Sequence, residues 1–135
     1  MMAAVTDLAD SGALVSCHDV SDGGALVALA EMLLAAPRDL VLGVALDLSD
    51  ARLPNIEAAF RFLFGENGGY VAEVAPEREA EVRRTLEARG VWFVKLGETT
   101  DSGSVAVRGL PRGVEASVDV QRLEKAWRTG MTEVI

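Results

Sequence analysis

The sequence predicts an α/β (α+β) fold in which helices cover a mixed β-sheet. Segments typical of strands and segments with helical spacing alternate along most of the 135 residues, and two strand-like segments come together near the end. Half of the residues are hydrophobic, which is the composition of a globular chain with a buried core. At this length we expect a single domain over residues 1–135.

Apolar runs and their breakers define the first four elements. Residues 3–11 have helical spacing and stop at a Ser-Gly pair, a helix-end signal. Residues 13–19 form a short apolar run that predicts a buried strand. Residues 23–36 are apolar on almost every face and end at a proline, so we expect a helix packed inside the fold. Residues 40–48 alternate enough to predict a second strand.

Two helices flank the next predicted strand. Asn55 is a good N-cap for a helix that runs through Phe64. A glycine-rich turn at residues 65–69 leads into a half-buried strand at 70–74. Residues 76–89 predict a charged helix that opens at a proline and is closed by a glycine. The side chains expected on one face of the first of these helices are Ile56, Ala59, Phe60 and Leu63.

The last part of the chain predicts three strands and a helix. Residues 91–96 are expected to form a strand with its bulky side chains in the core. Residues 104–108 and 114–118 predict two strands about a glycine-containing turn, and 121–128 predict the final helix. The side chains expected to face inward are Trp92, Phe93 and Val94 in the first segment, and Leu123 and Trp127 share one face of the last.

Charge and composition exclude several classes of function. The net charge of −8 is opposite to the basic surface that nucleic acids and anionic membranes require. No segment reaches the roughly 20 apolar residues of a membrane span, and the N-terminus lacks the pattern of a secretory signal. The single cysteine, Cys17, cannot form an internal disulfide. We therefore expect a reducing, cytoplasmic location, with the Cys17 thiol buried and inert.

Two aspartates stand at the junction between the first strand and the apolar helix. Asp19 and Asp22 are three residues apart across a polar turn that ends in Gly23-Gly24. Such a pair binds Mg²⁺ together with substrate oxygens, or accepts hydrogen bonds from ribose or amide groups. The alternative is structural: Ser21 or Asp22 caps the helix, and Asp19 stabilises the turn.

His18 and Glu66 are further candidates. His18, at the end of the strand, is either an acid, a base or a hydrogen-bond donor, or a structural residue whose nitrogens are satisfied. Glu66 faces the same cleft edge as Asp22 if both turns open at one end of the sheet, and otherwise is an exposed turn carboxylate. The sequence has neither a Walker loop nor a nucleophile elbow, and the catalytic residue stays unknown.

Two motifs together resemble a known family. The first is His18-Asp19-Val20-Ser21-Asp22-Gly23-Gly24, followed by an apolar helix that carries Glu31-Met32. The second is Leu63-Phe64-Gly65-Glu66-Asn67-Gly68-Gly69, which leads into the strand at 70–74. In order and spacing they are similar to the C-terminal domain of phosphoribosylformylglycinamidine synthase, the large synthetase of purine biosynthesis. Asn67-Gly68 departs from that family, which has Ser-Gln there.

The resemblance implies a fold of the aminoimidazole ribonucleotide synthetase-like type and a part in an ATP-dependent ligase. The ligase converts formylglycinamide ribonucleotide to its amidine with ammonia from glutamine; ATP activates the amide oxygen as a phosphate, which ammonia displaces. ATP and Mg²⁺ belong to the full enzyme, with neither held tightly by this chain. The chain alone is expected to be inactive, a C-terminal, substrate-side domain. The substrate-binding residues it implies are His18, Asp19, Ser21, Asp22, Gly23, Gly24 and Glu66, with Asp22 also a metal ligand.

The same resemblance implies partners and leaves alternatives. The partners are a preceding ATP-binding domain, a glutamine amidotransferase subunit and a small accessory subunit, and a homodimer is a further assembly it allows. One alternative is another enzyme of the superfamily, such as aminoimidazole ribonucleotide synthetase or selenophosphate synthetase, which have other residues at the first turn. The other is a non-catalytic oligomerisation or ligand-binding module, which suits the all-apolar helix.

Overall fold

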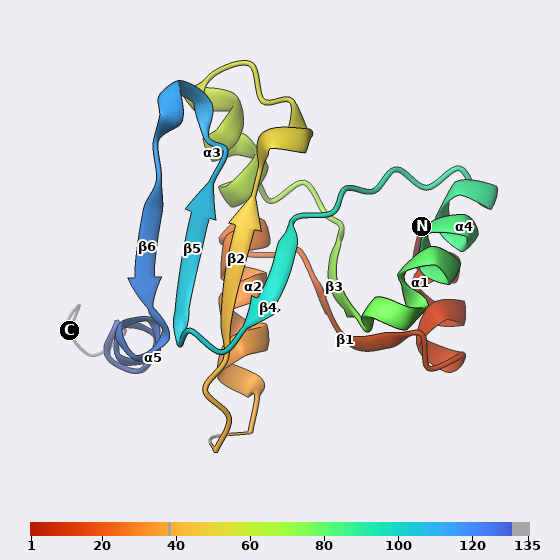
Figure 1. The fold of residues 1–135 in the computed structure, drawn as a ribbon, viewed down its shortest axis with the longest axis horizontal. Coiled ribbons are helices and arrows are strands. Elements are labelled where there is room, and N and C mark those ends of the chain that lie inside the picture. Colours follow the sequence, from red (N-terminus) through yellow and green to blue (C-terminus); the bar gives the residue numbers. More distant parts are fainter. Residues whose placement is uncertain (38, 131–135) are drawn as a thin grey trace.

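The computed structural model describes residues 1–37 and 39–130, and these residues form the mixed α/β fold that the sequence predicts (Figure 1). The α-helices are α1 (Met2–Asp10), α2 (Gly24–Ala35), α3 (Ile56–Phe64), α4 (Glu79–Ala88) and α5 (Val120–Thr129). The strands are β1 (Leu14–Asp19), β2 (Gly43–Asp47), β3 (Tyr70–Val74), β4 (Gly97–Thr100), β5 (Ser104–Arg108) and β6 (Ala116–Asp119). Short 3-10 turns are η1 (Ser49–Ala51), η2 (Pro76–Arg78) and η3 (Pro111–Gly113).

The strands form two sheets that lie side by side. Four strands pair in the order β4-β2-β5-β6, with β2 and β5 parallel and the outer pairs antiparallel. β1 and β3 form a separate antiparallel pair, which lies between the larger sheet and helices α1 and α4 (Figure 1). The hydroxyl of Thr99 on β4 donates to Glu73 on β3 at 2.8 Å, so the two sheets are joined by side chains rather than by a ladder.

Each sheet has its own apolar core. Helices α2 and α3 and the four-stranded sheet bury one cluster, and α1 and α4 bury a smaller one against the β1-β3 pair. Burial of this apolar area is the main force that holds the layers together. The larger cluster consists of Leu29, Val44, Leu46, Leu48, Leu63, Val105 and Val107, and the smaller one of Leu8, Ala13 and Val82. No helix in the described ranges is long and apolar enough to cross a bilayer.

Helix ends follow the predicted signals closely. Gly12, at φ +69°, ends α1, and the following Ala13 donates its N–H to the carbonyl of Leu8 at 2.9 Å. Gly90 ends α4 in the same way, at φ +62°. This left-handed glycine after the C-cap satisfies carbonyls that the helix leaves free. Asn55 caps α3 as predicted, because its side chain accepts the backbone N–H three residues on at 2.8 Å.

The strand predicted at residues 91–96 is wrong. None of its residues belongs to a strand, and β4 begins only at Gly97. Only the last residue of the segment bonds to β2, where the N–H of Asp47 donates to the carbonyl of Leu96 at 2.8 Å. A Cβ at Gly97 would lie 2.0 Å from the carbonyl oxygen of Ala45, so the chain approaches β2 where a side chain is absent. Trp92, expected in the core, is 75% exposed. Phe93 instead contacts α4, with its ring 5.1 Å from the guanidinium of Arg83.

β1 is half-buried rather than buried. Its side chains alternate, and Val15 is 62% exposed because one face of the two-stranded sheet has no layer over it among the described residues. Cys17 points to that face and is exposed, so the predicted buried thiol is wrong. Partial desolvation, and then the Asp19 carboxylate, raise the pKa of the Cys17 thiol above its ordinary value.

Two helix faces and two strand starts also differ from prediction. In α3, Phe60 is 58% exposed and stacks on Phe64 at 5.7 Å between ring centroids, instead of facing the core. In α5, Leu123 packs inward while Trp127 is 58% exposed. β2 starts at Gly43, later than the apolar run, and β6 starts two residues later and ends one residue later than predicted, after η3.

Candidate functional site

The pairing of β1 with β3 brings the two predicted motifs together. Asp19, at the end of β1, lies opposite Tyr70, at the start of β3. The turn that follows β1 is therefore beside the turn that precedes β3. The N–H of Val20 donates to the carbonyl of Gly69 at 2.9 Å, which extends the ladder into both turns. The condition that both turns open at one end of a sheet is thus met.

A direct hydrogen bond joins the two motifs. The backbone N–H of Gly23 donates to Oε1 of Glu66 at 3.0 Å, across 43 residues of sequence. Glu66 is exposed, as the structural alternative supposed, yet its carboxylate lies at the N-terminus of α2. A negative group is stabilised there by the free N–H groups and the helix dipole. Glu66 therefore occupies the position that an anionic ligand of this helix end would take.

The two glycines of the first motif are required by the backbone. Gly23 and Gly24 have φ +82° and +78°, in the left-handed region. A Cβ on Gly24 would lie 2.5 Å from the carbonyl carbon of Phe64, at the end of α3. The close approach of these two backbones, with Gly24 buried, fixes the start of α2 against the second motif.

The structural alternative for Ser21 and Asp22, a side-chain cap on α2, is wrong. The N-cap is Gly23, which has no side chain, and neither Ser21 nor Asp22 caps the helix. The N–H of Gly24 bonds to the carbonyl of Ser21 at 3.0 Å, and Glu66 takes the N–H of Gly23, so Ser21 and Asp22 are left outside the helix end. Both are exposed, and neither side chain has a hydrogen-bond or ion-pair partner among residues 1–37 and 39–130. These two side chains are free to meet a ligand.

His18 is held on both sides of its ring. Nδ1 lies 2.7 Å from the backbone oxygen of Asp19, and Nε2 lies 3.2 Å from Oε2 of Glu31 on α2. The side chains of His18 and Glu31 are 31% and 26% exposed. The sequence predicted a site role for His18 but none for Glu31, which it showed only as part of the helix that follows the first motif. The available signal was that Glu31 is the only charged residue of the twelve in α2.

The described residues do not fit a complete ATP or Mg²⁺ site. Asp19 is 66% exposed, and Asp19, Asp22 and Glu66 bring three carboxylates to the paired turns. Every Arg or Lys ion pair among the described residues involves other acids, so none of these three carboxylates is paired with an Arg or Lys there. No group of three His, Cys, Asp or Glu side chains there is placed to hold a metal ion. A phosphate or a metal would need groups from outside these residues.

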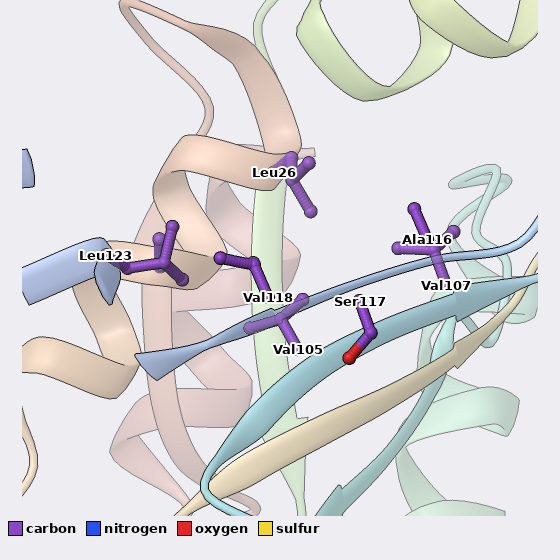
Figure 2. Close-up of a pocket in the computed structure, with 8 residues that line it drawn as sticks. Leu26, Val105, Val107, Ala116, Ser117, Val118 and Leu123 are labelled. Carbon is purple, nitrogen blue, oxygen red and sulfur yellow. The ribbon is translucent and has the colours of Figure 1, made fainter. Parts of the chain in front are cut away.

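A separate cleft lies between α2, α5 and strands β5 and β6. Its volume is about 140 Å³ and its lining is almost entirely apolar. Figure 2 shows Leu26, Val118 and Leu123 around the same space. Ser117 is the one polar lining residue, and the lining has no acid or base that could activate its hydroxyl. The candidate site is therefore the paired turns.

The sequence has a family match and named relatives. Residues 1–109 match the family described as AIR synthase related protein, C-terminal domain. Phosphoribosylformylglycinamidine synthase subunit PurL of Carboxydothermus hydrogenoformans is 36% identical over 101 residues, 74% of this chain and 13% of that protein. The subunit of the same name from Corynebacterium glutamicum is 33% identical over 123 residues, 91% of this chain and 15% of that protein. The chain thus spans a small part of the length of these relatives.

Solved structures of Thermotoga maritima PurL share the fold. PurL complexed with ATP aligns with a TM-score of 0.72 and 17% identity, over 89% of this chain and 20% of that one. PurL complexed with FGAR aligns with a TM-score of 0.68 and 16% identity, over 89% and 19%. PurLQS aligns with a TM-score of 0.71 and 19% identity, over 87% and 20%. At these identities the likeness is one of fold.

Proposed function

Because the chain belongs to the AIR synthase related protein family, as its C-terminal domain, we propose that it is a domain of a phosphoribosylformylglycinamidine synthase. The relatives of that name, and the fold shared with PurL, support this proposal. The enzyme converts formylglycinamide ribonucleotide to formylglycinamidine ribonucleotide, using ATP and ammonia released from glutamine. The chain covers 13% and 15% of two such relatives, so the activity belongs to a larger assembly.

We propose that this domain forms the substrate side of the active-site cleft. The single observation that carries the proposal is the hydrogen bond from Gly23 to Glu66, at 3.0 Å, which unites the two motifs into one site. Beside it, the side chains of Ser21 and Asp22 project without partners in the described chain. Ionised carboxylates only accept hydrogen bonds, so they suit the N–H and O–H donors of a ribonucleotide. Its phosphate would be repelled here and is expected to lie elsewhere.

The glycines and the glutamate have a supporting role in this proposal. Gly23 and Gly24 allow the backbone of the turn to come close to substrate and to α3. The Glu66 carboxylate offsets the positive end of the α2 dipole. The site therefore disfavours anionic ligands and favours ligands that donate hydrogen bonds. Asp22 serves as a magnesium ligand only if donors from another domain complete the coordination.

Cofactors and partners follow from the same assignment. ATP and Mg²⁺ act in the intact enzyme, bound mostly by a preceding domain, because the described residues offer no phosphate cradle with a cation. A glutamine amidotransferase subunit supplies ammonia, and a small accessory subunit completes the complex, in line with the PurLQS structure among the fold neighbours. We place the enzyme in the cytoplasm.

Two measurements test the assignment. The purified 135-residue chain is expected to show neither ATP hydrolysis nor amidine formation. Steady-state turnover by the chain alone would contradict the proposal that another domain binds ATP. Sequencing the flanking DNA is expected to show an ATP-binding domain in the same reading frame, upstream of Met1. A stop codon in that frame, directly upstream, would instead favour an independent module.

A further inference from the structure

Both ring nitrogens of His18 are engaged inside the protein. Nδ1 lies 2.7 Å from the backbone oxygen of Asp19. A carbonyl oxygen only accepts hydrogen bonds, so this contact requires a proton on Nδ1. The Nδ1 atom is also 3.7 Å from Oδ1 of the same Asp19, which favours the same protonation. One nitrogen of the ring is thus assigned as a donor to its own strand.

The second nitrogen faces a carboxylate. Nε2 lies 3.2 Å from Oε2 of Glu31, and both side chains are mostly shielded from solvent. Two lone pairs cannot face each other at this distance without repulsion, so one proton lies between Nε2 and Oε2. With Nδ1 and Nε2 both occupied, His18 has no nitrogen left with which to bind or protonate a substrate.

We propose that His18 and Glu31 are positioning residues, and that His18 acts on the site through the backbone of Asp19 rather than by touching substrate. This rests on the proposed function of the paired turns. Glu31 lies seven residues beyond Gly24, which is about 10 Å along α2 at 1.5 Å per residue. The pair therefore ties β1 to the body of α2 at one end, while Glu66 ties the turn to α2 at the other.

The position of Asp19 depends on this tie. Asp19 is the last residue of β1, and its neighbour Val20 still bonds across to Gly69. The His18 ring binds the carbonyl of Asp19 and so fixes the peptide that orients the Asp19 side chain. The Asp19 carboxylate itself stays 66% exposed. Loss of Glu31 would free the ring to rotate and release that carbonyl. The expected consequence is a misplaced Asp19 and a looser turn.

The ring can be observed directly because His18 is the only histidine of the chain. We would record long-range ¹H–¹⁵N spectra of the 135-residue chain near neutral pH, for wild type, Glu31→Gln, Glu31→Ala and the control Glu57→Gln. Glu57 is an exposed helix glutamate that pairs with Arg61 and does not contact His18. In the wild type and the control, Nδ1 is expected to carry a proton. In Glu31→Gln the amide donates to Nε2, which gives a neutral ring protonated at Nδ1.

In Glu31→Ala the ring should show the exchanging mixture of a solvated histidine. Identical ring signals in wild type and Glu31→Ala, or an unprotonated Nδ1 in the wild type, would overturn the pairing. In the intact synthetase, Glu31→Ala should lower kcat/KM by about 10- to 100-fold through misplacement, with part of the loss restored in Glu31→Gln. Unchanged kinetics beside altered ring signals would overturn the positioning role. Absence of amidine formation by the wild-type synthetase would instead refute the proposed function and leave the ring result standing.

Discussion

Replacing Gly24 by alanine tests whether the first motif is built on a contact between two backbones. The added Cβ would lie 2.5 Å and 2.6 Å from the carbonyl carbon and Cα of Phe64, and 2.8 Å from the carbonyl oxygen of Leu63. Those atoms are backbone in the last turn of α3 and cannot move aside as a flexible side chain would. The residue also has φ +78°, which an L-amino acid adopts at a cost.

The magnitude has two parts. The left-handed conformation costs about 1–2 kcal/mol per non-glycine residue, and forcing an extra methyl group into a packed site costs about 1–3 kcal/mol more. We therefore expect Gly24→Ala to lower the free energy of unfolding by about 2–5 kcal/mol. Gly68→Ala is the matched control, because Gly68 has φ +73° and an added Cβ there has no atom within 4 Å. The control should lose only the conformational part, about 1–2 kcal/mol.

The assay is urea unfolding of the wild type and the two variants, monitored by circular dichroism. If the dependence of the unfolding free energy on urea concentration is the same for all three proteins, differences between their midpoints report differences in stability. The difference between the two variants isolates the contact with α3 and is expected to be about 1–3 kcal/mol. Equal losses for Gly24→Ala and Gly68→Ala would refute the claim that the first motif packs directly on the end of α3.

Three further predictions concern other parts of the molecule. Glu66→Ala should destabilise the chain by about 1 kcal/mol and Glu66→Gln by less, because glutamine still accepts the N–H of Gly23; equal midpoints for wild type and Glu66→Ala would contradict this. The chain should bind a hydrophobic dye or self-associate, because Phe60, Trp92 and Trp127 are 58%, 75% and 58% exposed; a clean monomer without dye response in sedimentation and fluorescence would count against it. Hydrogen bonds from Ser49, and then the charge and hydrogen bond of Arg108, hold the pKa of Asp47 below its ordinary value of 3.8. These interactions therefore stabilise the folded chain fully above pH 3.8, and the stabilisation is lost as the pH falls through the lower pKa of the folded state. Asp47→Asn should flatten this acid loss in melts recorded against pH, and an unchanged profile would disprove it.

Local signals were sufficient for much of the fold. The glycines after α1 and α4, the Asn55 cap and the apolar helix α2 were predicted, because each depends on a few neighbouring residues. The misplaced strand at 91–96 shows where such signals end. Trp92 and its neighbours have strand propensity, but pairing with β2 begins at Gly97, where the opposing carbonyl of Ala45 leaves no space for a side chain.

The sequence named candidate residues for the site but not the contacts between them. The motif glycines and Glu66 were identified, and the register of β1 with β3 then placed the two turns together. Residue spacing could not reveal that Glu66, rather than Ser21 or Asp22, serves the end of α2, since that contact spans 43 residues. The same holds for Glu31, whose role depends on how α2 lies along β1.

The most direct test of the central claim is the effect of Asp22→Asn on the stability of this chain and on turnover of the intact synthetase. Asp22 has no partner in the described chain and does not cap α2, so the free energy of unfolding should change by less than about 0.5 kcal/mol. Amidine formation should fall by about 10-fold or more, the equivalent of one hydrogen bond to a charged group. Asp10→Asn, at the exposed end of α1, should leave both unchanged. Full turnover in Asp22→Asn, with stability unchanged, would contradict a substrate-binding role for this turn.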